Sequence, residues 1–136
     1  MSLRSILLRA YFSQRERAID TFRRHPVETQ ARMFRQLLRR GRRTEFGWRY
    51  NLGRIRTPEQ FASMVETFDY DTFKPYIERM LAGESDVTAP GRVTLFARSS
   101  GTTSDRSKYI PVTRESLWWN HTLGMRDVAT VFAANN

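Results

Sequence analysis

The sequence predicts an α/β chain in which four amphipathic helices precede a strand, a loop, a second strand and a last helix. Up to about residue 88, apolar residues recur every three or four positions, which indicates helices. Between residues 92 and 134, two short apolar runs enclose a loop of small side chains and lead into another helical pattern. Because two strands form only a marginal sheet, we expect residues 1–136 to be the N-terminal part of an incomplete α/β domain.

The first two helices are separated at His25-Pro26. The residue before a proline avoids the helical region, and proline itself suits the first turn of a new helix. The first helix is expected to end near Arg24, with its arginines mostly on the solvent side: Arg4, Arg9, Arg15, Arg17 and Arg23. The second is expected to end at Gly41 and to bury a stripe made by Val27, Ala31, Phe34 and Leu38.

The next two helices carry clear start signals. Residues 44–56 are expected to form a loop or short turns. Thr57 can then cap a helix, with Pro58 at its first position and Gln60 where a capping box requires it. A fourth helix is expected from Asp71 to Ala82-Gly83. Its apolar face consists of Phe73, Tyr76, Ile77, Met80 and Leu81.

The last part of the chain contains the two expected strands, at residues 93–97 and 109–112. Thr113 can cap a long final helix, with Glu115 in its first turn. Within this helix, His121 either lines a substrate pocket or packs as a partly buried residue, which is more common. Trp118-Trp119 can contact an aromatic substrate, but at least one of the pair is expected to pack in the core.

The composition restricts the classes of function. There is no cysteine and there are two distant histidines, so we expect no transition-metal site. The absence of cysteine fits a cytoplasmic protein. No apolar run approaches the roughly 18 residues of a membrane-spanning helix.

Positive charge is concentrated at the start of the chain. Residues 1–56 hold 15 arginines against four acidic residues, a net charge of +11, whereas residues 57–136 hold eight basic and ten acidic groups. One interpretation is a basic, arginine-rich helical module that binds nucleic acid or an anionic surface. The other, which we favour, is the polar side of ordinary amphipathic helices, because the mixed aromatic and basic pattern of nucleic-acid motifs is missing.

The loop between the strands has the composition of a phosphate-binding loop. Successive amides and hydroxyls can surround an anion, a glycine lets the backbone approach it, and the ammonium of Lys108 can lie nearby. A flexible polar hairpin loop is the alternative. In neither case is the loop between the strands a Walker P-loop, which requires a second glycine followed by lysine at the start of a helix. The loop residues are Ser99, Ser100, Gly101, Thr102, Thr103 and Ser104.

With its flanks, this loop resembles a family signature. The run from Phe96 to Thr113 is similar to the phosphate loop of the GH3 family, the adenylate-forming acyl-acid amido synthetases. Thr44-Glu45-Phe46-Gly47 is similar to an early Thr-x-Phe-Gly segment of that family. The stretch from Tyr70 to Glu84 looks like the helix that precedes the loop. One departure is Asp105, where many members carry a second glycine.

The resemblance implies an ATP- and Mg²⁺-dependent ligase. In this family a carboxylic acid is converted into an acyl adenylate with release of pyrophosphate, and an amino-acid amine then forms the amide. The expected phosphate-holding residues are Ser99, Ser100, Gly101, Thr102, Thr103, Ser104 and Lys108. No catalytic residue or metal ligand is assigned. The adenine- and ribose-binding segments come later in family members, so we expect this chain to be inactive alone and to expose apolar surface that favours self-association.

Overall fold

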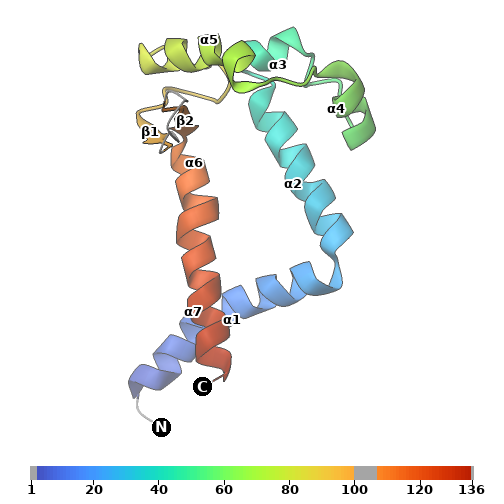
Figure 1. Ribbon diagram of the computed structural model, residues 1–136. Coiled ribbons are helices and arrows are strands. Elements are labelled where there is room, and N and C mark those ends of the chain that lie inside the picture. The colour runs from blue at the N-terminus through green and yellow to red at the C-terminus, as the bar shows by residue number, and fades with distance from the viewer. Residues whose placement is uncertain (1–2, 100–106, 136) are drawn as a thin grey trace. The chain divides into compact units, whose positions relative to one another are not determined.

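The computed structural model describes residues 3–99 and 107–135, with side chains from Phe12 onward except those of residues 13, 14, 134 and 135. The described part is mostly helical and contains one two-stranded sheet (Figure 1). The predicted combination of helices with a strand pair is confirmed, whereas a larger α/β sheet stays a prediction. The elements are α1 (Leu3–Arg24), α2 (Pro26–Gly41), α3 (Glu45–Arg49), α4 (Pro58–Met64), α5 (Tyr70–Leu81), β1 (Leu95–Arg98), β2 (Tyr109–Val112), α6 (Arg114–Ser116), the π-helical η1 (Leu117–Thr122) and α7 (Leu123–Asn135).

The chain forms two compact units. One consists of Met1–Arg32 and Arg114–Asn136, and the other of Met33–Thr113. In the first unit, α1 packs on α7. Arg15 donates two hydrogen bonds to Asp127, from Nε to Oδ1 at 2.7 Å and from Nη2 to Oδ2 at 2.8 Å. The expectation that Arg15 lies on the solvent side is therefore wrong, because its side chain is only 20% exposed in this ion pair.

The final helix is not uniform. A π-helical segment, η1, separates α6 from α7, and the Leu123 N–H donates to the carbonyl of Trp118, five residues earlier. A single turn of this kind accommodates one extra residue in a helix. Trp118, Trp119 and Met125 are exposed on this stretch, as is His121. Within the described chain, two expectations are therefore wrong: that His121 is a partly buried packing residue, and that one of Trp118 and Trp119 packs in the core.

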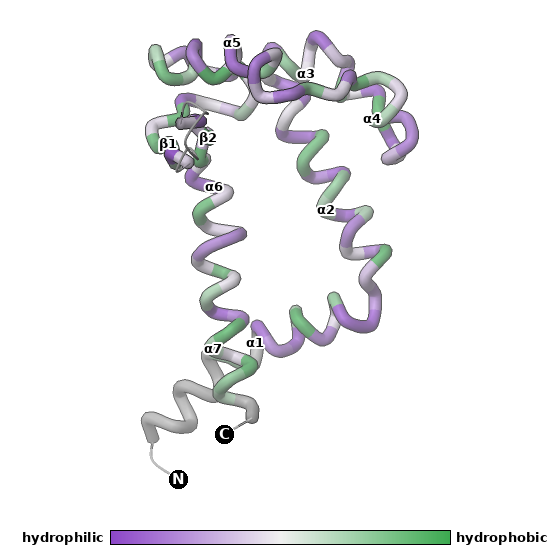
Figure 2. The backbone as a smooth tube through the Cα atoms, viewed as in Figure 1, coloured by the Kyte–Doolittle hydropathy of each residue, from purple (hydrophilic) through white to green (hydrophobic). Residues whose placement is uncertain are grey.

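Helix α2 begins and ends where the sequence predicts. Pro26 is its first residue and Gly41 its last, and hydrophobic and hydrophilic positions alternate along it (Figure 2). The buried stripe is shorter than expected. Leu38 is buried and Phe34 packs on the same cluster, but Val27 is 73% exposed, because the packed core lies in the second unit, which begins at Met33.

Helix α3 replaces the loop expected after α2. Thr44 is its N-cap: Thr44 Oγ1 accepts a hydrogen bond from Gly47 N at 3.0 Å and donates one to Gly41 O at 2.8 Å. The backbone of α3 is also tied to the segment before β1. Glu45 N donates to Asp86 O at 2.8 Å and Phe46 N donates to Val87 O at 3.0 Å. Side-chain capping and backbone pairing therefore hold a helix too short to be stable by itself.

Two hydrophobic clusters make the core of the second unit. One is built around Tyr76, Ile77, Met80, Val87 and Val93. The other is built around Leu38, Tyr50, Leu52 and Ile55. Phe46 and Phe68 pack against both clusters, with their ring centroids 5.9 Å apart. These two aromatic rings therefore join α2 and α3 to α5 in one continuous core.

The caps of α4 and α5 match their sequence signals. Thr57 and Gln60 form the predicted capping box of α4, with Pro58 in the first turn. Helix α5 starts slightly earlier than predicted, because Asp69 caps it and accepts a hydrogen bond from Thr72 N at 2.8 Å. It ends at a glycine with φ of +92°, Gly83, as a helix-terminating turn requires.

Strands β1 and β2 are antiparallel neighbours. Leu95 pairs with Val112, and Arg98 pairs with Tyr109 at the opposite end. The second strand has its predicted bounds, whereas the first begins two residues later than predicted. Val93 lies before it and is buried in the α5 cluster instead. Among the described residues, no helix is long and apolar enough to span a membrane.

The packing of α3 gives a direct stability test. A Cβ at residue 47 would lie 2.0 Å from the carbonyl oxygen of Gly41, so Gly47→Ala must displace backbone. We expect the free energy of unfolding to fall by about 3 kcal/mol or more, measured by urea denaturation. Gly53→Ala is the matched control, because no atom lies within 4 Å of its Cβ. It should change stability by less than about 1 kcal/mol; equal effects of the two substitutions would contradict the packing argument.

Candidate functional site

The structure describes two of the seven predicted phosphate-loop residues. Ser99 follows β1 and Lys108 precedes β2. Ser100, Gly101, Thr102, Thr103 and Ser104 lie outside the described residues, as does Asp105. Their phosphate-binding role therefore stays a prediction.

Ser99 and Lys108 close the mouth of this loop. Ser99 N donates to Lys108 O at 3.0 Å, and Lys108 N donates to Ser99 Oγ at 3.1 Å. The first of these bonds continues the antiparallel backbone pairing beyond Arg98 and Tyr109, and the second adds a side-chain contact from the Ser99 hydroxyl. The loop therefore starts and ends at one point, with a hydroxyl and a lysine side by side at its base.

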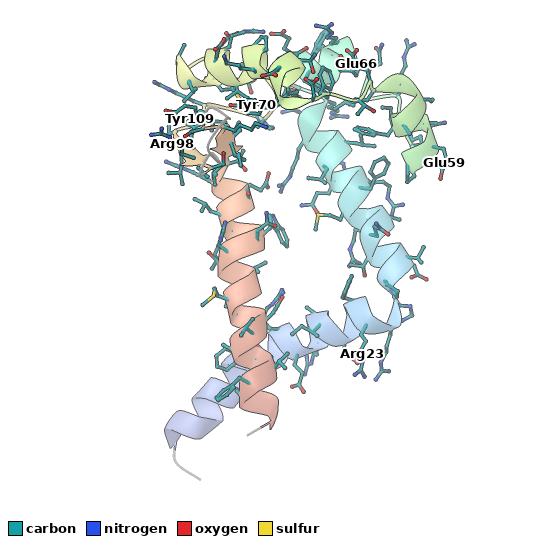
Figure 3. All side chains as sticks on the ribbon, viewed as in Figure 1. Arg23, Glu59, Glu66, Tyr70, Arg98 and Tyr109 are labelled. Atoms are coloured by element: carbon teal, nitrogen blue, oxygen red, sulfur yellow. The ribbon has the colours of Figure 1, made fainter. Side chains whose placement is uncertain are left out.

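Helix α5 contacts the loop base through Tyr70. The Tyr70 hydroxyl accepts a hydrogen bond from Tyr109 N at 2.9 Å, and Figure 3 shows the two tyrosines next to each other. The Lys108 ammonium lies 5.3 Å from the centroid of the Tyr70 ring, which is within the range of a cation–π contact. Tyr70 thus positions both the strand and the lysine. This role of Tyr70 was not predictable from the sequence, because one tyrosine at a helix start carries no distinctive signal.

Asp69 supplies negative charge close to this lysine. Hydrogen bonds from the backbone and the hydroxyl of Thr72 lower the pKa of Asp69, and the positive charge of Lys108 adds a smaller contribution. Asp69 is therefore ionised at neutral pH. It stabilises the α5 N-terminus through the cap and the helix dipole.

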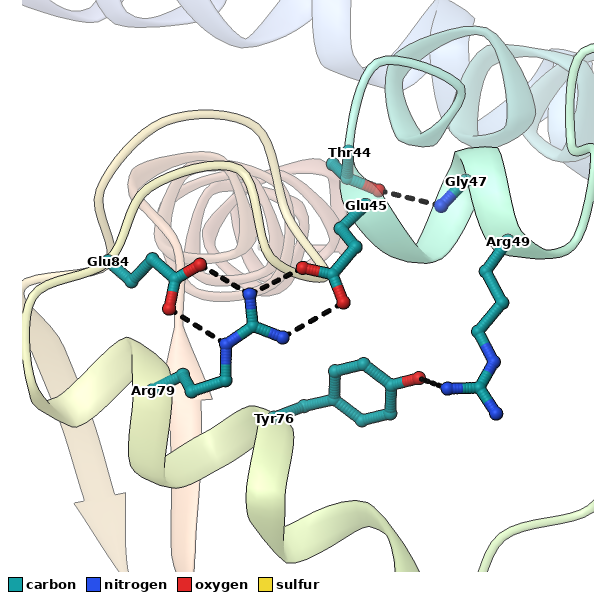
Figure 4. A network of polar contacts seen from close by, with 7 residues as sticks. All are labelled: Thr44, Glu45, Gly47, Arg49, Tyr76, Arg79 and Glu84. Atoms are coloured by element: carbon teal, nitrogen blue, oxygen red, sulfur yellow. Dashed lines mark hydrogen bonds and ion pairs between the residues drawn. The ribbon is translucent and has the colours of Figure 1, made fainter.

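A second polar cluster joins α3 to the C-terminal end of α5 (Figure 4). Gly83 N donates to Met80 O at 3.0 Å and Glu84 N donates to Arg79 O at 3.1 Å, the hydrogen bonds of a Schellman motif. This turn brings Glu84 back over Arg79, whose Nε donates to Glu84 Oε2 at 2.7 Å. Arg79 also donates through Nη1 to Glu45 Oε1 at 2.9 Å.

The charges of this cluster neutralise one another. Hydrogen bonds from Arg79 lower the pKa of Glu45 and also that of Glu84. Nearby, Arg49 Nη1 donates to the hydroxyl of Tyr76 at 3.1 Å, and the Tyr50 hydroxyl donates to Glu66. A hollow of about 380 Å³ lies beside this cluster, and the charged side chains that line it are Glu45, Arg49, Glu66 and Arg79. Because each arginine already has a protein partner, we interpret the cluster as a structural connection between α3 and α5.

The described residues contain no group of three histidine, cysteine, aspartate or glutamate side chains placed to hold a metal ion. His121, Trp118 and Trp119 belong to the first unit. The strand–loop–strand segment with Ser99 and Lys108 therefore remains the candidate site in the second unit.

Comparison with known proteins identifies the family. The GH3 family N-terminal domain matches residues 15–135 of this chain. The chain belongs to the GH3 family, which confirms the resemblance carried by the loop and its flanks.

Three relatives come from Arabidopsis thaliana. Indole-3-acetic acid-amido synthetase GH3.2 is 30% identical over 100 residues, which are 73% of this chain and 18% of the relative. Indole-3-acetic acid-amido synthetase GH3.4 is 28% identical over 107 residues, 78% of this chain and 18% of the relative. Indole-3-acetic acid-amido synthetase GH3.10 is 40% identical over 57 residues, 41% of this chain and 10% of the relative. The matched part thus amounts to less than a fifth of each of these proteins.

The Arg79 cluster predicts a pH dependence. Because the pKa values of Glu45 and Glu84 are lowered below 4.5 in the folded chain, their pairing stabilises the fold above that pH. The stabilisation is lost as the pH falls through the lowered values. The difference in free energy of unfolding between wild type and Arg79→Gln should therefore be largest near neutral pH and shrink in acid and at high salt.

Lys74→Gln serves as the control for this experiment. It also removes one positive charge from α5, but Lys74 forms a single ion pair with Glu78, at 3.4 Å. Chemical denaturation across the pH range should show a smaller pH-dependent difference for this variant. A wild-type minus Arg79→Gln difference that stays constant with pH would contradict the assigned pairing.

Proposed function

We propose that this chain is the phosphate-binding N-terminal part of an ATP-dependent acyl-acid amido synthetase. The observation that carries the proposal is the convergence of Ser99 and Lys108 at the base of a serine- and threonine-rich loop. Membership of the GH3 family supports the same class of reaction, because the matched relatives are named as amido synthetases. The substrates would be a small carboxylic acid and an amino acid, in the cytoplasm.

The residues of the loop would hold the phosphates of ATP. Backbone amides and hydroxyls from Ser99 to Ser104 can donate hydrogen bonds to phosphate oxygens, which are stronger when the acceptor is charged. The ammonium of Lys108 can reach the same phosphates as a point charge. Tyr70 would limit the motion of this ammonium by contact with its ring. The departure at Asp105 places an acid beside this site.

ATP would supply the adenylyl group that activates the substrate carboxylate, with pyrophosphate as the leaving group. Binding the phosphates in line with the attacking carboxylate is the task of the loop, since positioning and charge stabilisation dominate phosphoryl chemistry. Mg²⁺ would neutralise phosphate charge during this step. Phosphate oxygens are suitable Mg²⁺ ligands, and we assign none of the described residues to the ion.

The chain contains two lysines, Lys74 and Lys108, which makes a labelling experiment selective. An ATP derivative with a lysine-reactive acyl phosphate should acylate an amine that lies beside bound phosphates. We expect labelling of Lys108, detected by peptide mass spectrometry, and its suppression by excess ATP. Lys74 is the internal control, because it lies on α5 in an ion pair with Glu78. Equal labelling of both lysines, or labelling of Lys108 that ATP does not suppress, would contradict the proposed site.

The proposal also includes inactivity of this chain by itself. It spans 18% of the length of relatives such as GH3.2, and the nucleotide base, ribose and amine are proposed to bind outside this span. Purified chain mixed with ATP, Mg²⁺ and a panel of carboxylic acids should release no pyrophosphate above the protein-free rate. Sustained turnover would overturn this part of the proposal while leaving the labelling result intact.

A further inference from the structure

Four arginines surround one small hollow on the second unit. Arg35 and Arg39 lie in the C-terminal half of α2, Arg42 is the first residue after α2 ends at Gly41, and Arg56 lies just before Thr57, the N-cap of α4. The hollow has a volume of about 240 Å³. Positions 35, 39 and 42 are four and three residues apart, and Arg42 N still donates to Leu38 O at 3.0 Å, so the helical spacing that places the three on one face extends to Arg42.

The positive charge of this hollow is not balanced by its lining. Among the residues that line it there is no aspartate or glutamate, the other members being Leu38, Leu52, Gly53 and Ile55. The hollow beside Tyr76 is different, because its lining contains two glutamates, Glu45 and Glu66, as well as two arginines, Arg49 and Arg79. Of these two hollows, the one beside Tyr76 therefore contains acidic counter-charges and the other does not.

The geometry of the hollow lined by four arginines suits recognition of phosphate. Arg56 Nη1 donates to Gly53 O at 2.7 Å and to Ile55 O at 2.9 Å, which fixes one guanidinium against the wall. Ile55 and Leu38 are 2% and 7% exposed; they give the hollow an apolar floor that strengthens charge–charge interactions by lowering the local dielectric constant. Guanidinium groups match phosphate oxygens with paired donors.

We propose that this hollow, which we call the arginine hollow (Arg35, Arg39, Arg42 and Arg56), binds a small multivalent phosphate anion of the diphosphate or triphosphate type. Its volume is below the roughly 300–1,000 Å³ of sites for drug-sized ligands, which favours a compact anion over a whole nucleotide. The proposal does not rest on the Ser99–Ser104 loop, because the residues involved are different. It assigns a role to four of the 15 arginines in residues 1–56.

The test is a titration of the purified 136-residue chain with pyrophosphate in the absence of Mg²⁺, in which isothermal titration calorimetry measures binding. The test variant is Arg35→Gln with Arg39→Gln, both exposed helix positions. The control is Arg43→Gln with Arg54→Gln, which removes the same charge from exposed positions of the same unit that do not line the hollow. We expect the test variant to weaken binding about tenfold or more and the control to change it less than about twofold.

Circular dichroism serves to check that both variants keep the helical content of the wild type. Equal weakening in the two variants would overturn the proposal, because it would indicate non-specific attraction to total charge. Tight binding of a single-stranded oligonucleotide without binding of pyrophosphate would also overturn it, in favour of a nucleic-acid surface. Absence of pyrophosphate binding to the wild-type chain rejects it directly. Lys108 labelling by the ATP derivative should be unaffected in the test variant, which separates this hollow from the loop.

Discussion

The carbonyl oxygen of Gly41 occupies the space that a side chain at residue 47 would need, and the second unit is built around this contact. Thr44 makes the approach possible: its backbone N–H and its hydroxyl both donate to that oxygen, at 3.0 and 2.8 Å. The same hydroxyl accepts from Gly47 N at 3.0 Å. This buried hydroxyl bonds an amide and a carbonyl at once and fixes the turn from α2 into α3, because the Gly47 amide would be left unpaired without it.

The position of α3 determines that of the candidate site. Phe46 contacts both hydrophobic clusters, and Glu45 pairs with Arg79 near the end of α5. The other end of α5 carries Tyr70, which holds Tyr109 and lies beside Lys108. A chain of packed and hydrogen-bonded groups thus connects the Thr-x-Phe-Gly segment to the base of the loop. Two segments that carry the family resemblance are therefore parts of one physical arrangement.

Much of this arrangement was predictable from local sequence signals. Pro26, Gly41, Thr57 and Gly83 mark helix ends at the observed positions, because caps and breakers act within a few residues. The pairing of Ser99 with Lys108 also follows from two strands joined by a loop. The five-residue helix α3 was not predicted, since a helix of that length shows no periodicity and depends on Thr44 and on backbone contacts with Asp86.

Contacts between distant parts of the sequence could not be predicted, because local sequence signals act over only a few residues. Arg15 and Asp127 are 112 positions apart, and Tyr70 and Tyr109 are 39 positions apart. The spacing of Arg35, Arg39 and Arg42 was visible in the sequence, but the arrival of Arg56 at the same hollow depends on the turn after α3. The π-helical segment has no sequence signal that we recognise. The five loop residues from Ser100 to Ser104 stay predictions from composition and resemblance.

The Thr44 turn should stabilise the loop base as well as α3, which native-state hydrogen exchange of Thr44→Val can measure. This substitution keeps the shape of the side chain but removes the hydroxyl. We predict that exchange at the amides of Ile77 and Tyr109 accelerates by a common factor of about ten or more, since a lost cap and an unpaired buried amide cost about 1–3 kcal/mol. Thr88→Val removes a hydroxyl that donates to Met80 Sδ at 3.4 Å and should leave both amides nearly unchanged. Faster exchange confined to α3, with Tyr109 unaffected, would contradict the claim.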